Sequence, residues 1–422
     1  MLGSFCGLAR RSLPFGVPQK RLVSPLTSFL HVRTLSTLPT ATAPKFSIID
    51  STLREGEQFA TAFFDTEDKK HIATQLSHIG VDYIELVTPM ASSQSFKDCE
   101  EIAKLGLRSK VLTHIRCHMT DAKTAIASGV DGVNMYMATS QALAQFSHGK
   151  GIEHIIEQAT EVIQYCQKYK VEVRFSCEDT FRSNMEDLLA VYTAVDALRV
   201  HRIGLADTVG VATPMQVYNT VKHIRERVLC DIEYHTHDDT GCCIANALMA
   251  LDAGVTHIDT CVLGIGERNG ITPLGGFLAR MYTLDKKRIR ARYNLPLLRD
   301  LELYVANKCG IDIPFNNYVT GSSAFNHKAG VHSKAVIQNP GSYEVLDPAD
   351  FGVRRNISIA HRLTGWNAVA ARAQQLGLDL PIDQIKEATN FIKNLADTTD
   401  VSADDLDDKL RELANGSVPP GA

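Results

Sequence analysis

Two short motifs of this chain carry side chains that can bind a metal ion. The first, Asp50-Ser-Thr-Leu-Arg-Glu-Gly-Glu-Gln58, follows a short apolar run and places an acid, a base and an amide close together. The second, His235-Thr-His237, lies in another strand-like run, where residues two apart point to the same face. Two imidazoles and a distant carboxylate can form a three-ligand metal site with open positions for a substrate. We therefore predict Glu55, His235 and His237 as metal ligands.

The elements that must position these residues follow an alternating pattern. Between residues 46 and 285, short apolar runs alternate with segments whose apolar residues repeat at helical spacing. Eight runs are predicted to be strands: 46–50, 82–86, 110–115, 133–137, 171–176, 202–206, 231–235 and 257–263. This alternation favours an α/β fold, a (β/α)8 TIM barrel, over the alternative of a doubly wound open sheet.

Local signals place some boundaries of these elements. Thr66 is predicted to cap a helix that Gly80 ends, and Thr213-Pro214 is predicted to start another helix. Gly264-Ile-Gly266 and Gly270 resemble a nucleotide-binding loop superficially. They follow the last predicted strand and fit the dinucleotide fingerprint poorly, so we interpret them as a tight loop between a strand and a helix.

Polar side chains fall near the carboxyl end of most predicted strands. In a TIM barrel these ends meet at one face, which carries the chemistry. The residues concerned are Arg54, Glu55, Glu85, His114, Glu178, Thr208, His235 and His237. Together they predict a single polar active-site mouth.

The two ends of the chain differ from this barrel segment, 45–285. Residues 1–49 contain no Asp or Glu and are rich in Arg and Ser, which is typical of a mitochondrial transit peptide. A disordered basic tail is the alternative for residues 1–44. The alternation stops at residue 286, and 286–415 is predicted to be a mainly α-helical region with helices near 295–308, 368–376, 382–395 and 404–408. Residues 416–422 are predicted to be a disordered tail.

The overall composition excludes several classes of protein. A formal net charge of -4 argues against a nucleic-acid-binding surface. No apolar stretch approaches the roughly 20 residues that span a membrane. The ten cysteines show no paired spacing, so we interpret them as reduced thiols, mostly buried.

The motifs resemble those of the family of acetyl-CoA-dependent condensing enzymes that includes 2-isopropylmalate synthase and homocitrate synthase. Within this family, they resemble those of the homocitrate synthases. The resemblance extends from Phe46 to about Asp397. Beside the two motifs above, it rests on Leu112-Thr-His-Ile-Arg-Cys-His118, Phe146-Ser-His-Gly-Lys150, Glu178-Asp-Thr-Phe-Arg182, Ala206-Asp-Thr208, Gly264-Ile-Gly-Glu-Arg-Asn-Gly-Ile-Thr-Pro273 and Phe325-Asn-His-Lys-Ala-Gly-Val-His332.

This resemblance implies a metal-dependent Claisen condensation on a (β/α)8 barrel. It implies a homodimer in which the C-terminal region of one chain covers the partner's active site. A divalent metal (Zn, Mn, Mg or Co) would chelate the 1-carboxylate and 2-oxo group of a 2-oxo acid, with acetyl-CoA as co-substrate. Arg54 would stabilise the developing alkoxide and Thr208 would bind the 1-carboxylate. Gln58 would orient the reacting groups, His114 is implied to line the same pocket, and Ser176 is implied to bind substrate.

The resemblance also implies the acid–base residues. Removal of a proton from the acetyl methyl group needs a positioned base. His332, helped by Glu178, is implied as that base, and Tyr343 is implied to assist it. Glu85 is implied to lie in the same pocket. The alternative for His332 is a solvated loop histidine.

One departure from the family pattern affects the substrate. Homocitrate synthases carry an arginine that pairs with the distal carboxylate of 2-oxoglutarate, and Ala144 stands at that position here. Loss of one partner of a desolvated charge pair costs roughly 2–5 kcal/mol. Two expectations stay open: 2-oxoglutarate is used to give homocitrate, with Arg116 or His148 as a substitute cation, or a less charged 2-oxo acid gives an alkylmalate-type product.

A second departure affects feedback inhibition. Asn134 stands where the family usually has an aspartate that holds the ammonium group of the inhibitor lysine. Glu233 and Arg299, two further positions linked to lysine inhibition, are retained. We therefore expect weak lysine binding.

Two other classes of function remain as alternatives. Two histidines and a carboxylate are also the ligand set of non-haem iron oxygenases. A metal-binding regulatory or structural subunit is the second alternative. A structural barrel has no need of so many ionisable residues at its mouth, so we expect an acyltransferase of lysine biosynthesis, located in the mitochondrial matrix.

Overall fold

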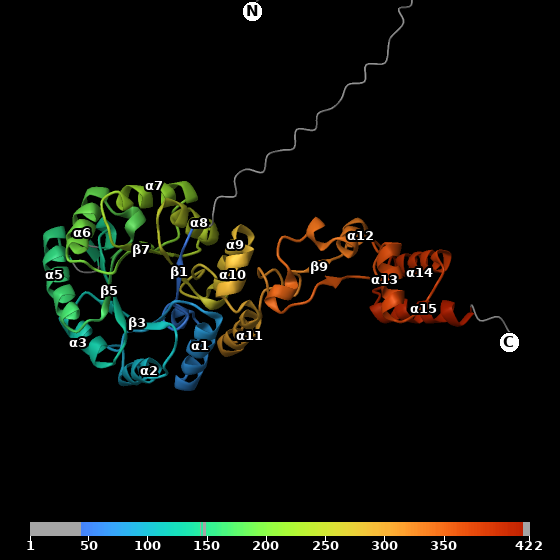
Figure 1. Cartoon of the computed structure of the whole chain (residues 1–422), viewed down its shortest axis with the longest axis horizontal. Helices are drawn as coiled ribbons and strands as arrows, with labels where there is room; N and C mark the ends of the chain where they lie inside the picture. Colours follow the sequence, from blue (N-terminus) through green and yellow to red (C-terminus); the bar gives the residue numbers. More distant parts are fainter. Residues whose placement is uncertain (1–43, 144, 147–148, 417–422) are drawn as a thin grey trace, which may run out of the picture. The chain divides into compact units, whose positions relative to one another are not determined.

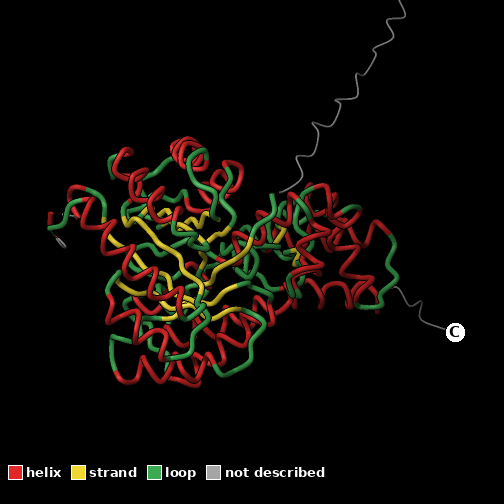
Figure 2. Tube along the Cα trace, turned by 60° about the vertical axis from the view of Figure 1, so that its left-hand side comes forward, coloured by secondary structure: helices red, strands yellow, loops and turns green. Residues whose placement is uncertain are grey.

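The computed structural model describes residues 44–143, 145–146 and 149–416. Eight strands form a closed barrel in which neighbouring strands run parallel, including the first and the last. Helices surround this ring of strands (Figures 1 and 2). The strands are β1 Ser47–Asp50, β2 Tyr83–Leu86, β3 Lys110–Arg116, β4 Gly132–Ala138, β5 Glu172–Glu178, β6 Arg202–Asp207, β7 Asp231–Thr236 and β8 His257–Thr260. The predicted TIM barrel is confirmed.

Strand β5 shows how the sequence produces the two faces of the barrel wall. Val173, Phe175 and Cys177 are fully buried in the apolar layer of the core. Arg174 alternates with them, and alternate residues of a strand point to opposite faces. Its Nε atom donates to Oε1 of Glu233 on β7 at 2.8 Å. The inside of the barrel therefore holds buried ion pairs, while the apolar core lies between the strands and the helices.

The helices that follow the strands of the barrel begin and end at recognisable signals. Asp65 caps α1 through a reciprocal hydrogen-bond pair with Asp68, so the prediction of Thr66 as the cap is wrong by one residue. Gly80 ends α1 in the left-handed conformation (φ 105°), as predicted. Thr213 caps α7, also as predicted. These helices are α1 Thr66–Ile79, α2 Ser93–Ala103, α3 Met119–Ala127, α4 Gln141–Leu143, α5 Ile152–Lys168, α6 Met185–Ala197, α7 Pro214–Arg225 and α8 Cys243–Ala253.

Strand β8 ends earlier than predicted. Leu263 has a left-handed backbone (φ 58°) and lies in a 3-10 turn, Val262–Gly264, so the strand cannot continue to residue 263. The glycine-rich segment after it forms the tight loop that we predicted, because the Ile271 N–H donates to the Gly264 carbonyl at 3.1 Å. Gly270 is required there: a Cβ atom would lie 1.7 Å from the Gly264 carbonyl oxygen.

The C-terminal region is mainly helical, as predicted. The helix expected at 295–308 begins only at Leu298, after a 3-10 turn that contains Pro296. The elements are α9 Leu274–Leu284, α10 Lys286–Arg292, α11 Leu298–Cys309, α12 Gly330–Gln338, α13 Trp366–Gln375, α14 Ile382–Leu395 and α15 Ala403–Gly416, with the short parallel strands β9 Asn326–His327 and β10 Asn356–Ile357.

Two apolar clusters stabilise the described chain. The first includes the barrel and extends as far as Phe351. The second includes Ala360, Val369 and Ile392 and is made by helices α13, α14 and α15. Gly416 is the last residue of α15, so it does not belong to the tail predicted for 416–422, and residues 417–422 lie outside the described part. The described helices include none long and apolar enough to cross a bilayer.

Candidate metal centre and active site

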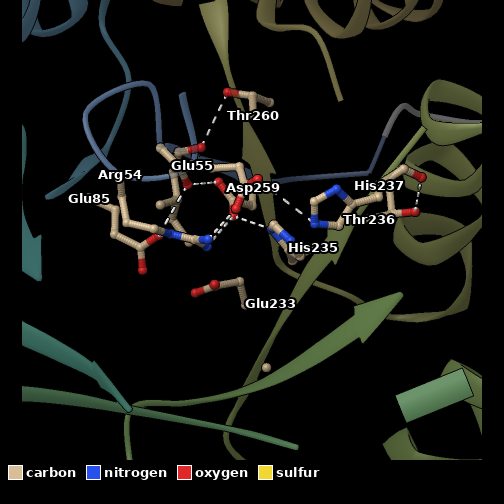
Figure 3. Close-up of polar contacts among 12 residues, drawn as sticks. Arg54, Glu55, Glu85, Glu233, His235, Thr236, His237, Asp259 and Thr260 are labelled. Atoms are coloured by element: carbon tan, nitrogen blue, oxygen red, sulfur yellow. Dashed lines mark hydrogen bonds and ion pairs between the residues drawn. The ribbon is translucent and has the colours of Figure 1, made fainter. Parts of the chain in front are cut away.

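The three predicted metal ligands come together at the carboxyl ends of β1 and β7. Their potential ligand atoms all lie within 4.8 Å of one another. Nε2 of His237 lies 3.9 Å from Oε1 of Glu55, and the two imidazole rings are 5.1 Å apart at 80°. Figure 3 shows both rings on the same side of β7, with the Arg54 side chain beside them. All three ligands are buried.

The protonation states of these residues suit a cation. Burial, together with the charge of Arg54, lowers the pKa of His235 to about 4, and burial with the nearby His235 lowers that of His237 to about 4. Both imidazoles are therefore neutral near pH 7, with lone pairs available. Burial opposes the ionisation of Glu55, but the charges of Arg54 and the histidines outweigh it and lower the pKa of that carboxyl. The Nδ1 atom of His237 is buried and has no hydrogen-bond partner among the described residues. A divalent cation fits this donor set.

Asp259 holds one of the histidines in place. Its Oδ2 atom lies 2.7 Å from Nδ1 of His235, which leaves Nε2 of that ring for a metal. The Ser51 hydroxyl donates to the other carboxylate oxygen of Asp259. Asp259 is not among the residues predicted from the sequence. It lies near the carboxyl end of β8, so the rule that identified the other strand-end residues could have found it.

Arg54 joins the metal cluster to a second buried carboxylate. Its Nη1 atom lies 2.5 Å from Glu55, and its Nε atom donates to Glu85 at 2.8 Å. Glu85 also accepts a hydrogen bond from the Asn134 amide at 2.6 Å and lies 3.1 Å from Nδ1 of His114. Burial raises the pKa of Glu85, but Arg54 and His114 outweigh it and hold that pKa well below the usual range. Arg54 is therefore fixed between two carboxylates, with its charge beside the metal ligands.

The remaining predicted pocket residues of the barrel are also near strand ends. With its amide oriented to donate, Gln58 Nε2 lies 2.8 Å from Glu55. The Thr208 hydroxyl accepts from the Asp179 backbone N–H at 2.9 Å. Ser176 is buried and donates to a backbone carbonyl of β6. Glu178 is half-buried at the end of β5.

The loop after β8 contacts the metal cluster through its backbone. The Glu267 N–H donates to Oε1 of Glu55 at 2.9 Å. A Cβ atom at Gly266 would lie 2.9 Å from the same carboxylate oxygen. The glycine-rich loop therefore approaches and orients Glu55 through its backbone.

The predicted base lies outside the barrel. The rings of His332 on α12 and Tyr343 are 4.3 Å apart, and both side chains are exposed. Within the described residues, no contact joins this pair to Arg54 or to the three metal ligands. The structure therefore brings His332 and Tyr343 together but does not bring them to the metal centre of the same chain.

The structure describes only some of the residues that we linked to substrate choice and to lysine inhibition. Ala144 and His148 lie outside the described residues. Arg116, the other candidate for a substitute cation, donates two hydrogen bonds of 2.9 Å to Asp121. Glu233 is fully buried, whereas Arg299 is exposed on α11. The assignments of Asn134, Glu233 and Arg299 to an inhibitor site stay predictions.

Known proteins resemble this chain along most of its length. A model of the HMGL-like family matches residues 45–305, and one of the homocitrate synthase post-HMGL domain-like family matches 319–400. The mitochondrial homocitrate synthase of Schizosaccharomyces pombe is 58% identical over 367 residues, which cover 87% of this chain and 88% of that protein. The chain belongs to the homocitrate synthase family. The cytosolic isozyme of Saccharomyces cerevisiae is 56% identical over 375 residues, which cover 89% of this chain and 88% of that protein.

Solved structures show the same fold at lower identity. The HMG-CoA lyase of Bacillus subtilis has a TM-score of 0.58 and 22% identity, covering 64% of this chain and 96% of that one. The HMG-CoA lyase of Pseudomonas aeruginosa has a TM-score of 0.56 and 21% identity, covering 64% and 95%. The family that the motifs indicated is confirmed, and it favours an acyltransferase over the oxygenase and the non-enzymatic subunit.

Proposed function

We propose that this chain condenses acetyl-CoA with 2-oxoglutarate to give homocitrate and CoA, the first step of lysine synthesis by the aminoadipate route. The observation that carries the proposal is the cluster of Glu55, His235 and His237 beside Arg54. The names of relatives at 55–58% identity support 2-oxoglutarate over a less charged 2-oxo acid. In the reaction, the acetyl methyl carbon loses a proton and bonds to the 2-oxo carbon, and water then cleaves the thioester.

Glu55, His235 and His237 would hold a divalent metal, which would polarise the 2-oxo group of the substrate. Arg54 is held by two carboxylates and has its positive charge next to the ligands, where an oxygen of the substrate becomes negative. Thr208 accepts from the Asp179 N–H, which leaves its own hydroxyl hydrogen for a substrate carboxylate. Gln58 is assigned to the orientation of the reacting groups and His114 and Ser176 to the pocket wall.

The acid–base step is assigned to His332, with Tyr343 beside it and Glu178 as its helper. His332 lies in the C-terminal region, 286–415, and does not contact the metal cluster of its own chain in the described structure. This arrangement supports a homodimer in which His332 of each chain serves the active site of the other. Sedimentation of the purified chain as a monomer during turnover would contradict the exchange.

Location and metal are part of the same proposal. Relatives from several yeasts carry the word mitochondrial in their names, although one is a cytosolic isozyme. The acid-free segment 1–44 supports import into the mitochondrial matrix.

Two imidazoles, a carboxylate and substrate oxygens suit Zn, Mn, Mg or Co. Metal content after purification, followed by chelation and re-addition of single metals, identifies the native ion.

A single assay tests the function. CoA release from acetyl-CoA is measured with a thiol reagent, with added metal, against 2-oxoglutarate, pyruvate, 2-oxoisovalerate and phenylpyruvate. Turnover with 2-oxoglutarate alone supports homocitrate synthesis. Preference for a monocarboxylic acid would overturn it in favour of an alkylmalate-type product. Oxygen uptake with ferrous iron and 2-oxoglutarate, without CoA release, would favour an oxygenase.

The variant Ala144→Arg tests the reason for substrate choice. If no other cation holds the distal carboxylate, the new arginine lowers the KM for 2-oxoglutarate by about two to three decades. If another cation already holds it, the KM changes little. Ala142→Arg, two positions away, is the control for an added positive charge.

A further inference from the structure

A large pocket lies at the end of the barrel opposite the metal centre. It has a volume of about 860 Å³ and opens at the amino-terminal ends of β2 and β3. Residues from the end of α1, the end of α10 and the turn Pro348–Phe351 complete its wall. This volume lies within the range of small-ligand sites, which is roughly 300–1,000 Å³. None of the described residues assigned to the active site lines it.

The pocket is basic in a chain that is acidic overall. Arg108, Lys110, Arg290 and Arg292 line it against only two carboxylates, so its lining carries a positive formal charge while the whole chain carries -4. Arg292 pairs with Asp82 at 2.5 Å and Arg290 with Asp350 at 2.9 Å. Arg108 is exposed and has no carboxylate partner among the residues that the structure describes. A positive charge is thus left for a ligand.

The wall that carries these cations is held in place by short contacts. A Cβ atom at Gly80 would lie 2.9 Å from the Arg292 carbonyl oxygen, so the end of α1 packs directly on the segment after α10. The Asn294 N–H donates to the Ile79 carbonyl at 2.8 Å. Asp82 accepts from the Ile48 N–H through one oxygen and from Arg292 through the other. The binding of a ligand therefore requires little ordering of the backbone around it.

We propose that this pocket binds a small phosphorylated anion of nucleotide size. Arginine side chains present forked donors that match phosphate oxygens, and Lys110 adds a point charge. The half-buried Tyr83 lines the same pocket, and the pocket volume leaves room for a base or sugar beside the phosphate. The proposal does not depend on the function assigned to the opposite face.

The pocket is connected to the active-site side by a ladder of ion pairs. Lys110 pairs with Glu172, and Arg202 bridges Glu172 at 3.2 Å and Glu233 at 3.4 Å. Glu233 in turn accepts from Arg174. The charge of Arg174 acts on Glu85, which holds Arg54. An anion that draws Lys110 from Glu172 changes the charge balance of this ladder, so we expect its binding to change turnover.

Titration calorimetry on the full chain tests the binding, with ATP as the probe. We expect one site per chain and a loss of affinity of at least about tenfold in Arg108→Glu, in line with the removal of a charge-assisted contact. Arg227→Glu is the matched control: Arg227 is also exposed and precedes a strand at the same end of the barrel, but it does not line the pocket. Its affinity for ATP should equal that of the parent chain. Circular dichroism confirms folding, and Arg108→Gln replaces Arg108→Glu if the latter fails to fold.

Further binding measurements distinguish the proposed pocket from the active site, and a phosphate ligand from other anions. Acetyl-CoA also carries phosphates and could compete with ATP for the active site. If acetyl-CoA displaces bound ATP competitively, ATP occupies the active site and the proposal is overturned. Pyrophosphate should bind at the same site more tightly than citrate, whereas equal binding of citrate would overturn the choice of a phosphate ligand. Binding that Arg108→Glu leaves unchanged would overturn the site. Saturating ATP should alter the rate of CoA release in the parent chain and not in Arg108→Glu; an unchanged parent rate would overturn the connection through the ladder.

Discussion

Nδ1 of His235 lies 2.7 Å from Oδ2 of Asp259, across the gap between β7 and β8. His235 is neutral near pH 7 because its pKa is lowered to about 4. In the tautomer that donates to Asp259, the single ring proton is on Nδ1. The lone pair of Nε2 is then free for a cation. Asp259 therefore sets both the tautomer and the orientation of a metal ligand without contact to the metal.

We expect Asp259→Ala to weaken metal binding by about 10–100-fold, because the ring of His235 loses the partner that orients it. Asp259→Asn keeps an oxygen that can accept the Nδ1 proton, so its loss should be smaller. Calorimetric titration of the metal-free chain with Co²⁺ or Zn²⁺ measures both. Asp252→Ala, on the exposed side of α8, is the control. Unchanged metal affinity in a folded Asp259→Ala would contradict this role.

We expect His237→Ala to abolish CoA release and to leave a folded protein. The side chain is buried and its Nδ1 atom has no hydrogen-bond partner, so its loss breaks no network of the described structure. Circular dichroism checks that the variant is folded. The metal content of the purified variant shows whether metal binding is lost with the ligand. His223→Ala, a half-buried histidine on α7, controls for the removal of an imidazole. Turnover that survives in His237→Ala would remove the metal-site assignment.

Inhibition by lysine should be weak in the parent chain and stronger in Asn134→Asp. The Asn134 amide donates to Glu85 at 2.6 Å, and an aspartate there adds a negative charge that can attract an ammonium group. Initial rates against lysine concentration measure the effect in both proteins. Inhibition of the parent chain at micromolar lysine would contradict the hypothesis.

Glu302 should make the protein less stable as the pH rises. Burial raises the pKa of this carboxyl to about 7, although hydrogen bonds from Thr320 and Asn317 oppose the rise. Between roughly pH 4 and 7, the folded state binds more protons than the unfolded state, so the free energy of unfolding falls with increasing pH through this window. The change amounts to at most roughly 3–4 kcal/mol.

The variant Glu302→Gln tests this pH dependence. Glutamine cannot ionise and keeps an oxygen for Asn317 and Thr320, so the variant should gain stability relative to the parent between about pH 5 and about pH 7.5. Urea denaturation at both pH values measures the difference. Glu226→Gln, an exposed position after α7, should show no such gain. A difference that stays constant with pH would contradict the raised pKa.

The strands and the metal ligands could be predicted from the sequence because their signals are local. Alternating apolar runs indicate strands, and His235 and His237 share a face of β7 because strand residues repeat every two positions. The carboxyl ends of barrel strands meet at one face, so Glu55 could be joined to them across 180 residues of chain. The cap of α1 was misplaced by one residue because Asp65 and Thr66 are both able to cap, and only the backbone conformation chooses between them.

The tertiary structure decided which buried groups are partners. Asp259 reaches His235, and Asn134 and His114 reach Glu85, because parallel pairing in the barrel sets the register of β7 with β8 and of β2, β3 and β4. The basic pocket at the opposite end likewise combines the ends of α1 and α10 with the first residues of two strands. Side-chain types and their periodicity are properties of short segments and can be read along the chain. Contacts between segments far apart depend on how the barrel closes, and no local pattern carries that information.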